Sequence, residues 1–174
     1  IKKSIAEITP RFTTKRMIDD YIERFYTPLS KRSAEVCANN FAKAKELAAW
    51  KHNVATHWDD IELKSLDIKN LDHQSVEVGD HYDITAQIDT KGLNDNGIGI
   101  ELVVTYQDAK GQTHVSEVKE FDLVKREGSL LVYKLDYQLS QGGTYKYAFR
   151  MFPKNSDLPH RMDFCYVRWL QRLN

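Results

Sequence analysis

The side chains with the greatest capacity for chemistry are scattered along this sequence. His52 and His57 lie five residues apart, whereas two metal ligands on one helix face are usually spaced at i and i+4. Residues 94–97, Asn-Asp-Asn-Gly, have the oxygen-rich composition of a calcium loop. They lack its length and its closing glutamate, so they predict a tight turn. Cys37 has no neighbouring histidine that would activate its thiol. We therefore expect no catalytic and no metal-binding residue in this chain.

Three aromatic residues, Tyr145, Tyr147 and Phe149, alternate with Lys146 and Arg150 at the period of a β-strand. Alternation places the rings on one face of the strand and the charges on the other. The charged face should be the solvated one, so we expect the three rings to lie between two sheets. The alternative is that the rings face solvent, where Tyr145 and Tyr147 would form a stacking platform for a sugar.

Alternation of apolar and polar residues continues from Ile61 to the end of the chain and predicts a series of β-strands, of which the strand with these rings is one. A slip between Val115 and Val118 predicts a β-bulge. Short polar turns separate the runs at a spacing typical of a β-sandwich. The alternating runs cover residues 61–68, 82–88, 100–104, 115–123, 133–139, 145–151 and 164–169. We therefore predict an immunoglobulin-like antiparallel β-sandwich over residues 60–174, within an α+β, mainly β, fold class.

Residues 1–59 have a helical period instead. Pro10 should exclude an α-helix, and Thr13 or Thr14 suits the N-cap of the helix that follows. We expect this helix to end at Thr27-Pro28. Its apolar residues recur at i, i+3 and i+4 and form one stripe: Met17, Ile18, Tyr21, Ile22, Phe25 and Tyr26. We call these six residues the apolar stripe.

A second helix is predicted from Lys31 to about Trp58, where the sequence is rich in alanine and contains neither glycine nor proline. Trp50, Val54 and Trp58 have the spacing of an anchor at its C-terminal end. The thin, small-residue face of this helix suits close packing against the first helix or another domain.

The balance of charge excludes several classes of partner. The 174 residues carry 25 Lys and Arg against 25 Asp and Glu, which predicts neither a nucleic-acid partner nor an acidic membrane surface. No signal-peptide pattern and no apolar run of transmembrane length occurs. Cys37 and Cys165 have apolar neighbours, so we expect buried free thiols in a reducing compartment. These observations predict a cytoplasmic protein.

Two parts of the sequence resemble one enzyme family. Residues 8–26, ITPRFTTKRMIDDYIERFY, resemble the segment SPRFNTxRMVxEYVExFY that closes the glycosyltransferase core of bacterial α-glucan (glycogen) phosphorylases. Residues 76–80, 91–104 and 143–169 resemble the β-rich extension that often follows this core. The last of these, which ends in Arg168-Trp169, is the most specific. Residues 94–96 and Lys146 depart from the family pattern, where a proline-acidic turn and a glycine are usual.

The chain begins at Ile1, next to the segment that closes the family's core, so we expect it to be a C-terminal fragment. Residues 1–59 would be the helical segment that closes the missing core, and residues 60–174 the β-sandwich extension. The resemblance implies that the parent enzyme converts α-1,4-glucan to glucose 1-phosphate with pyridoxal phosphate bound to a lysine. The family's lysine motif, GTSxMK, and its glycine-rich loops do not occur in these 174 residues.

We therefore predict a non-catalytic structural and interaction extension, without a cofactor and inactive alone, with a glucan-binding β-sandwich module as the alternative. The resemblance also implies a partner for the apolar stripe, because family members use their closing helices to bridge the two halves of the catalytic core. Without those catalytic domains, we expect the second helix to cover one edge of the stripe. A homodimer with C₂ symmetry should cover the rest.

Overall fold

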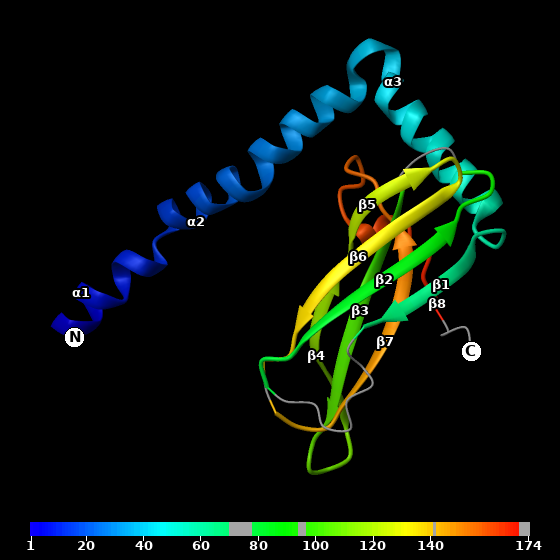
Figure 1. The fold of residues 1–174 in the computed structure, drawn as a ribbon. Coiled ribbons are helices and arrows are strands. Elements are labelled where there is room, and N and C mark those ends of the chain that lie inside the picture. The colour runs from blue at the N-terminus through cyan, green and yellow to red at the C-terminus, as the bar shows by residue number, and fades with distance from the viewer. Residues whose placement is uncertain (70–77, 94–96, 141, 171–174) are drawn as a thin grey trace. The chain divides into compact units, whose positions relative to one another are not determined.

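The computed structural model describes residues 1–69, 78–93, 97–140 and 142–170 (Figure 1). Expectations for residues 76–77 and for the turn at residues 94–96 lie outside the described residues. The chain divides into two compact units, Ile1–Ala49 and Trp50–Asn174, and each is described by itself. The division of function between residues 1–59 and 60–174 stays a prediction.

The first unit consists of consecutive helical elements. α1 (Lys2–Glu7) ends before Pro10, which lies in the first turn of the 3₁₀ helix η1 (Thr9–Phe12). Proline is tolerated there because the amide that it lacks has no partner within a helix. α2 (Thr14–Tyr21) begins at the predicted cap, where the Thr13 hydroxyl accepts a hydrogen bond from the Arg16 amide at 3.2 Å.

The predicted end of this helix at Thr27-Pro28 is wrong. α2 continues into one π-helical turn, η2 (Ile22–Tyr26), and then into α3 (Thr27–His57). Proline normally clashes with the carbonyl four residues before it, and here that carbonyl belongs to Arg24, inside the wider π-turn. The local change in helix geometry lets the chain pass Pro28 without stopping.

The absence of glycine and proline favoured an unbroken second helix, but the structure interrupts it. α3 breaks at residues 38–41, where Ala38 is extended and Asn39, Asn40 and Phe41 have positive φ. Asparagine adopts the left-handed conformation more readily than most residues because its short side chain bonds locally. The Asn39-Asn40 pair is therefore the local sequence signal for the break.

The second unit contains two four-stranded antiparallel sheets (Figure 1). One sheet has the strand order β1-β2-β6-β5, and the other has the order β4-β3-β7-β8. The Tyr133 hydroxyl crosses between them to the carbonyl of Ile98 at 2.6 Å. The strands are β1 (Glu62–Ile68), β2 (His81–Asp89), β3 (Ile98–Gln107), β4 (Thr113–Glu120), β5 (Asp122–Glu127), β6 (Leu130–Gln138), β7 (Tyr145–Pro153) and β8 (Arg168–Leu170).

The run at residues 115–123, predicted as one strand, belongs to two strands in different sheets. β4 ends at Glu120 and β5 begins at Asp122, so Phe121 alone carries the chain from one sheet to the other. The Phe121 ring is buried, and its amide donates to the carbonyl of Ile100 at 2.9 Å. Burial of this single residue therefore marks the change of sheet.

The bulge predicted between Val115 and Val118 is confirmed. Val104 of β3 pairs with Glu117, whereas the next residue, Thr105, pairs with Val115. Ser116 is the additional residue of β4. The bulge keeps Glu117 opposite Val104, on the face of the sheet that looks toward β6.

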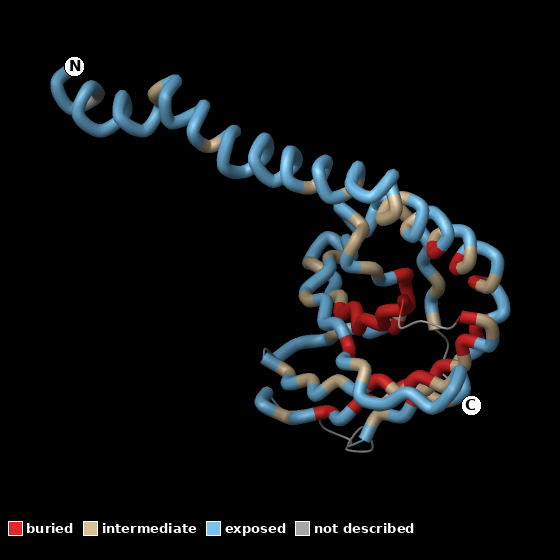
Figure 2. The backbone as a smooth tube through the Cα atoms, turned by 90° about the horizontal axis from the view of Figure 1, so that it is seen from above, coloured by how far each residue is buried: buried red, intermediate tan, exposed pale blue. Residues whose placement is uncertain are grey.

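The core lies between the sheets, where buried residues gather (Figure 2). Alternate residues of β2 are buried as the pattern predicted: Tyr82, Ile84, Ala86 and Ile88. Glu101 breaks the pattern, because it lies on the opposite face of β3 and is only 2% exposed. Its carboxylate accepts hydrogen bonds from Nε of Arg150 and, at 3.1 Å, from Nη1 of Arg161. These two guanidinium groups neutralise the buried charge.

The C-terminal segment covers the last turns of α3. The Trp50 ring packs on Phe164 and the Trp58 ring on Tyr166, with centroid separations of 5.4 and 5.5 Å. The anchoring role predicted for Trp50 and Trp58 is thus confirmed. The last strand begins later than predicted, at Arg168, because the 3₁₀ helix η3 (Arg161–Asp163) and an irregular stretch precede β8.

Both cysteines are free thiols, and both are exposed, so their predicted burial is wrong. Cys37 lies immediately before the break in α3, where the chain leaves the regular helix. Cys165 lies in the irregular stretch between η3 and β8 rather than on a strand, and its thiol donates to the carbonyl of Met162 at 2.6 Å.

Candidate functional site: the aromatic cleft between the sheets

The two sheets leave an open cavity of about 200 Å³ between them. Its walls come from β2 and β6 on one side and from β3 and β7 on the other. Four of the nine tyrosines of the chain line it: Tyr82, Tyr137, Tyr145 and Tyr147. We call this cavity the aromatic cleft, and its other lining residues are Ile68, Ile84, Leu102, Val104, Leu139, Gly143 and Phe149.

Strand β7 places three aromatic rings in the cleft. All three face the other sheet, as the alternation predicted. Phe149 is 4% exposed and packs edge-on against Phe121, with a centroid separation of 5.9 Å. Tyr145 is half-buried, and Tyr147 is 48% exposed, so the prediction that all three rings are enclosed is wrong for Tyr147. The sheets pack tightly at Phe149 and stand open at Tyr147.

A polar cluster lies at the wall of the cleft. Tyr137 of β6 hydrogen-bonds to the Glu117 carboxylate of β4, and Tyr145 lies close to Tyr137. Burial, and then the Glu117 carboxylate, raise the pKa of Tyr137 to about 12, because both disfavour the phenolate. The Tyr137 hydroxyl therefore keeps its proton and donates to Glu117, which also pairs with Lys119 at 2.8 Å.

The residues first considered for other chemistry do not assemble into a site. The Nδ1 atom of His57 lies 2.9 Å from the carbonyl of Asn53 in its own helix. Within residues 1–69, 78–93, 97–140 and 142–170, no group of three His, Cys, Asp or Glu side chains is placed to hold a metal. In the same ranges, no helix combines the length and the apolar character needed to cross a membrane.

The aromatic cleft does not fit pyridoxal phosphate. That cofactor needs a lysine for its Schiff base and donors for its phosphate. The described residues that line the cleft include neither lysine nor arginine. The cleft therefore has the character of a surface for rings and hydroxyls rather than for a phosphorylated cofactor.

The apolar stripe lies on α2 and η2. Its six side chains are between 44% and 64% exposed. Within the stripe, the rings of Tyr21 and Phe25 lie against each other with centroids 6.2 Å apart. Because α2, η2 and the start of α3 form one run, the first turns of α3 do not fold back on the stripe. Which groups cover the stripe stays a prediction.

Comparison with known proteins accounts for most of the chain. Residues 58–171, which include both sheets, match the family described as glycogen phosphorylase C-terminal domain. The chain belongs to this family. The resemblance inferred from residues 143–169 is thus confirmed, and the chain is a C-terminal region of an α-glucan phosphorylase.

Curated relatives extend this relationship to the helical unit. The maltodextrin phosphorylase of Thermococcus litoralis is 25% identical over 177 residues, which covers 97% of this chain and 20% of the relative. The glycogen phosphorylase of Mycobacterium tuberculosis is 21% identical over 159 residues, which covers 91% of this chain and 16% of the relative. The chain therefore spans about a fifth or less of the length of these relatives.

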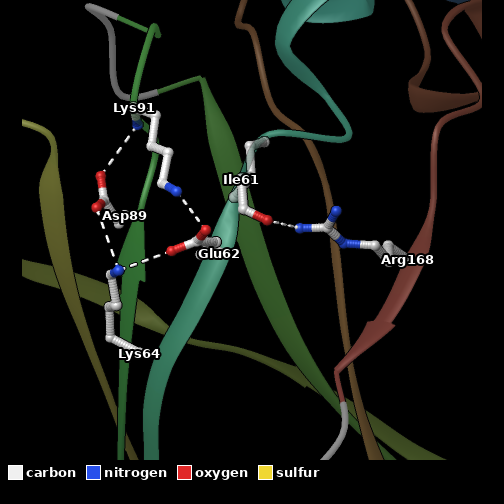
Figure 3. A network of polar contacts seen from close by, with 6 residues as sticks. All are labelled: Ile61, Glu62, Lys64, Asp89, Lys91 and Arg168. Atoms are coloured by element: carbon white, nitrogen blue, oxygen red, sulfur yellow. Dashed lines mark hydrogen bonds and ion pairs between the residues drawn. The ribbon is translucent and has the colours of Figure 1, made fainter.

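In this glycogen phosphorylase C-terminal domain, the Arg168-Trp169 motif has a structural role that the sequence did not reveal (Figure 3). The Arg168 guanidinium donates to the carbonyl of Ile61, as Figure 3 shows. It also donates to the carbonyl of Trp58 at 3.2 Å. These carbonyls follow α3 and need donors from outside the helix. Burial is the main cause that lowers the pKa of Arg168, and it is opposed by Asp59. Arg168 of β8 therefore holds this strand against the segment that leads into β1.

Exposed ion pairs lie beside this connection (Figure 3). The Glu62 carboxylate accepts from Lys64 at 2.7 Å and from Lys91, and these hydrogen bonds lower the pKa of Glu62. Lys64 also pairs with Asp89 at 3.6 Å. The pairs are solvent-exposed, so each contributes little to stability. They fix the edge of β1 against β2 rather than forming a site for chemistry.

Proposed function

We propose that this domain is a non-catalytic structural and interaction extension of an α-glucan phosphorylase, whose parent converts α-1,4-glucan to glucose 1-phosphate. Its partners would be the catalytic domains of the same protein. The two exposed free thiols suit the reducing environment of the cytoplasm, which we propose as its location.

The observation that carries this proposal is the apolar stripe. Burying one such side chain stabilises a complex by roughly 1.5–3 kcal/mol. Six of them together, at 44–64% exposure, form the kind of patch that marks a contact surface on a soluble domain. The family match covers residues 58–171, whereas the alignment with maltodextrin phosphorylase covers 97% of the chain. The helical unit is therefore related to phosphorylase sequence as well.

Reconstitution tests the proposal. The catalytic domains from the same gene would be produced as a separate chain, and their affinity for this domain measured by calorimetry. We expect Ile18→Asp to weaken binding at least tenfold, because it places a charge within the stripe. Ser33→Asp introduces the same charge at an exposed position outside the stripe and should leave binding unchanged. Absence of binding, or equal binding by the two variants, contradicts the proposal.

In the absence of the catalytic domains, we propose that the stripe mediates a homodimer with C₂ symmetry. Sedimentation equilibrium should show a dimer for the natural chain and a monomer for Ile18→Asp. Because the stripe is exposed within the chain, Ile18→Asp should keep the thermal midpoint of the monomer. A natural chain that stays monomeric at high concentration contradicts the self-association.

We also propose that the domain alone has no phosphorylase activity, since the sequence lacks the family's cofactor-lysine motif. The purified chain should show no absorption band of a pyridoxal Schiff base and should release no glucose 1-phosphate from glycogen. Turnover above background by the isolated chain contradicts this.

An immunoglobulin-like topology is the finer proposal for the sandwich. The order β1-β2-β6-β5 supports it, because it matches the A-B-E-D order of immunoglobulin domains, with β3, β7 and β8 in the C, F and G positions. An experimental structure with a different strand order contradicts it.

The second candidate function is glucan binding by the β-sandwich. The open aromatic cleft and the exposure of Tyr147 favour it. This function is compatible with the first, because the stripe and the cleft lie in different units of the chain.

A further inference from the structure

The aromatic cleft matches the chemistry of a sugar ring. A pyranose has faces of C–H groups and a rim of hydroxyls. The cleft offers the rings of Tyr145 and Tyr147 for the faces. For the rim it offers the Tyr137 hydroxyl, which bonds to the Glu117 carboxylate of β4. The Tyr137 hydroxyl already donates to Glu117, and its own oxygen still has lone pairs that can accept a hydrogen bond from a sugar hydroxyl.

The volume of the cleft limits the size of its occupant. An engineered cavity of about 150 Å³ is large enough to bind benzene. The cleft, at about 200 Å³, therefore has room for a single six-membered ring rather than for a segment of polymer. The tight packing around Phe149 closes one end of the cleft, so a ligand inserts its terminal ring. The exposed face of Tyr147 then remains available to the second ring of the same ligand.

Gly143 shapes the entrance. Its φ of +149° lies in a region that residues with side chains rarely adopt. A Cβ atom at this position would lie 3.2 Å from the Tyr145 ring. The backbone thus packs closely against one side of Tyr145, which orients the ring toward the cleft.

We propose that the aromatic cleft binds one terminal glucosyl unit of an α-glucan. Tyr145 and Tyr147 stack on the sugar, and the Tyr137 hydroxyl, held by Glu117, bonds to one of its hydroxyls. The choice of an α-glucan rests on the proposed function, because it follows from the enzyme family to which the domain belongs. The subsite would hold the end of a glucan chain on the β-sandwich of the phosphorylase.

Nuclear magnetic resonance on the full chain with labelled methyl groups tests the subsite. Titration with maltotriose should shift the methyl signals of Ile84, Leu102 and Leu139 in a saturable way. Tyr147→Ala should raise the dissociation constant at least tenfold through the loss of stacking. Tyr137→Phe keeps the ring volume and should raise it several-fold through the loss of the hydroxyl.

Two controls separate the possible outcomes. Phe12→Ala removes an exposed aromatic ring outside both the cleft and the apolar stripe and should leave the dissociation constant unchanged. Benzyl alcohol serves as a mainly apolar ring, and tighter binding of it than of maltotriose would overturn the sugar assignment. Unchanged methyl signals far from the cleft show that each variant is folded.

Absence of saturable shifts at the cleft overturns the inference, as does binding that neither Tyr147→Ala nor Tyr137→Phe weakens. These results are independent of the reconstitution experiment, which reports on the stripe. A chain that binds the catalytic domains but not maltotriose keeps its proposed function and refutes the subsite.

Discussion

The buried Glu101 carboxylate gives the sharpest test of how the sandwich is stabilised. Arg150 and Arg161 both donate to it, and Arg150 is the less exposed of the two guanidinium groups. Arg150 also lies 5.5 Å from the centroid of the Trp169 ring. Replacing Arg150 by alanine therefore removes a charged hydrogen bond and a cation–π contact while the carboxylate stays buried.

The expected loss of stability follows from these contacts. Removing one partner of a fully buried ion pair costs about 3–5 kcal/mol, because a charge is left without compensation. Arg161 remains beside Glu101, so Arg150→Ala should lower the free energy of unfolding by about 2–3 kcal/mol, near the contribution of a charged hydrogen bond. Arg161→Ala should lower it by about half as much, since its guanidinium is more exposed.

Urea unfolding followed by tryptophan fluorescence measures these losses, because Trp50, Trp58 and Trp169 all belong to the second unit. The matched control is Lys154→Ala, which removes an exposed partner of Glu120, the residue that pairs with Glu101 across the sheet. Its effect should stay below about 1 kcal/mol. If Arg150→Ala destabilises the domain no more than Lys154→Ala, the buried carboxylate does not have the role assigned to it.

Three further predictions follow from local geometry. Gly99→Ala should lower the free energy of unfolding in urea by about 1–3 kcal/mol, because its Cβ would lie 2.5 Å from the Phe152 ring. An unchanged urea midpoint contradicts this. The pKa of Asp108 is lowered chiefly by its hydrogen bond with His114 and then by backbone amides, so its stabilising effect is present above roughly pH 4 and is lost as the pH falls through the lowered value. The stability difference between the natural chain and Asp108→Asn should therefore shrink from pH 6 to pH 3, and an equal difference at both would refute the assignment. Both cysteines should react with Ellman's reagent without denaturant, since both thiols are exposed, and protection of either contradicts the structure.

The sequence predicted features that depend on local chemistry. The alternation in β2 located four buried side chains, and the hydroxyl of Thr13 located the start of α2. These signals are local because strand alternation and helix capping involve residues close in the chain. The position of Pro28 did not end the helix, since the π-turn before it changed the geometry on which that rule depends.

Features that depend on residues distant in the chain could not be predicted from local sequence patterns. Glu101 is buried because two arginines, 49 and 60 residues away in sequence, neutralise it. Tyr147 faces inward yet stays half exposed, because exposure depends on where the sheets separate rather than on alternation. The Tyr137–Glu117 contact joins strands of different sheets, and only the bulge in β4 offered a local hint of it.

The passage through Phe121 restricts how the length of this domain can vary. One residue joins β4 to β5, so an insertion there would turn the side chains of one strand to the opposite face of its sheet. The turn from Asp108 to Gln112 is exposed at residues 109–112 and is closed by hydrogen bonds between its own backbone groups. Insertions and deletions among relatives should therefore collect at such turns, while the spacing between Glu120 and Asp122 stays constant.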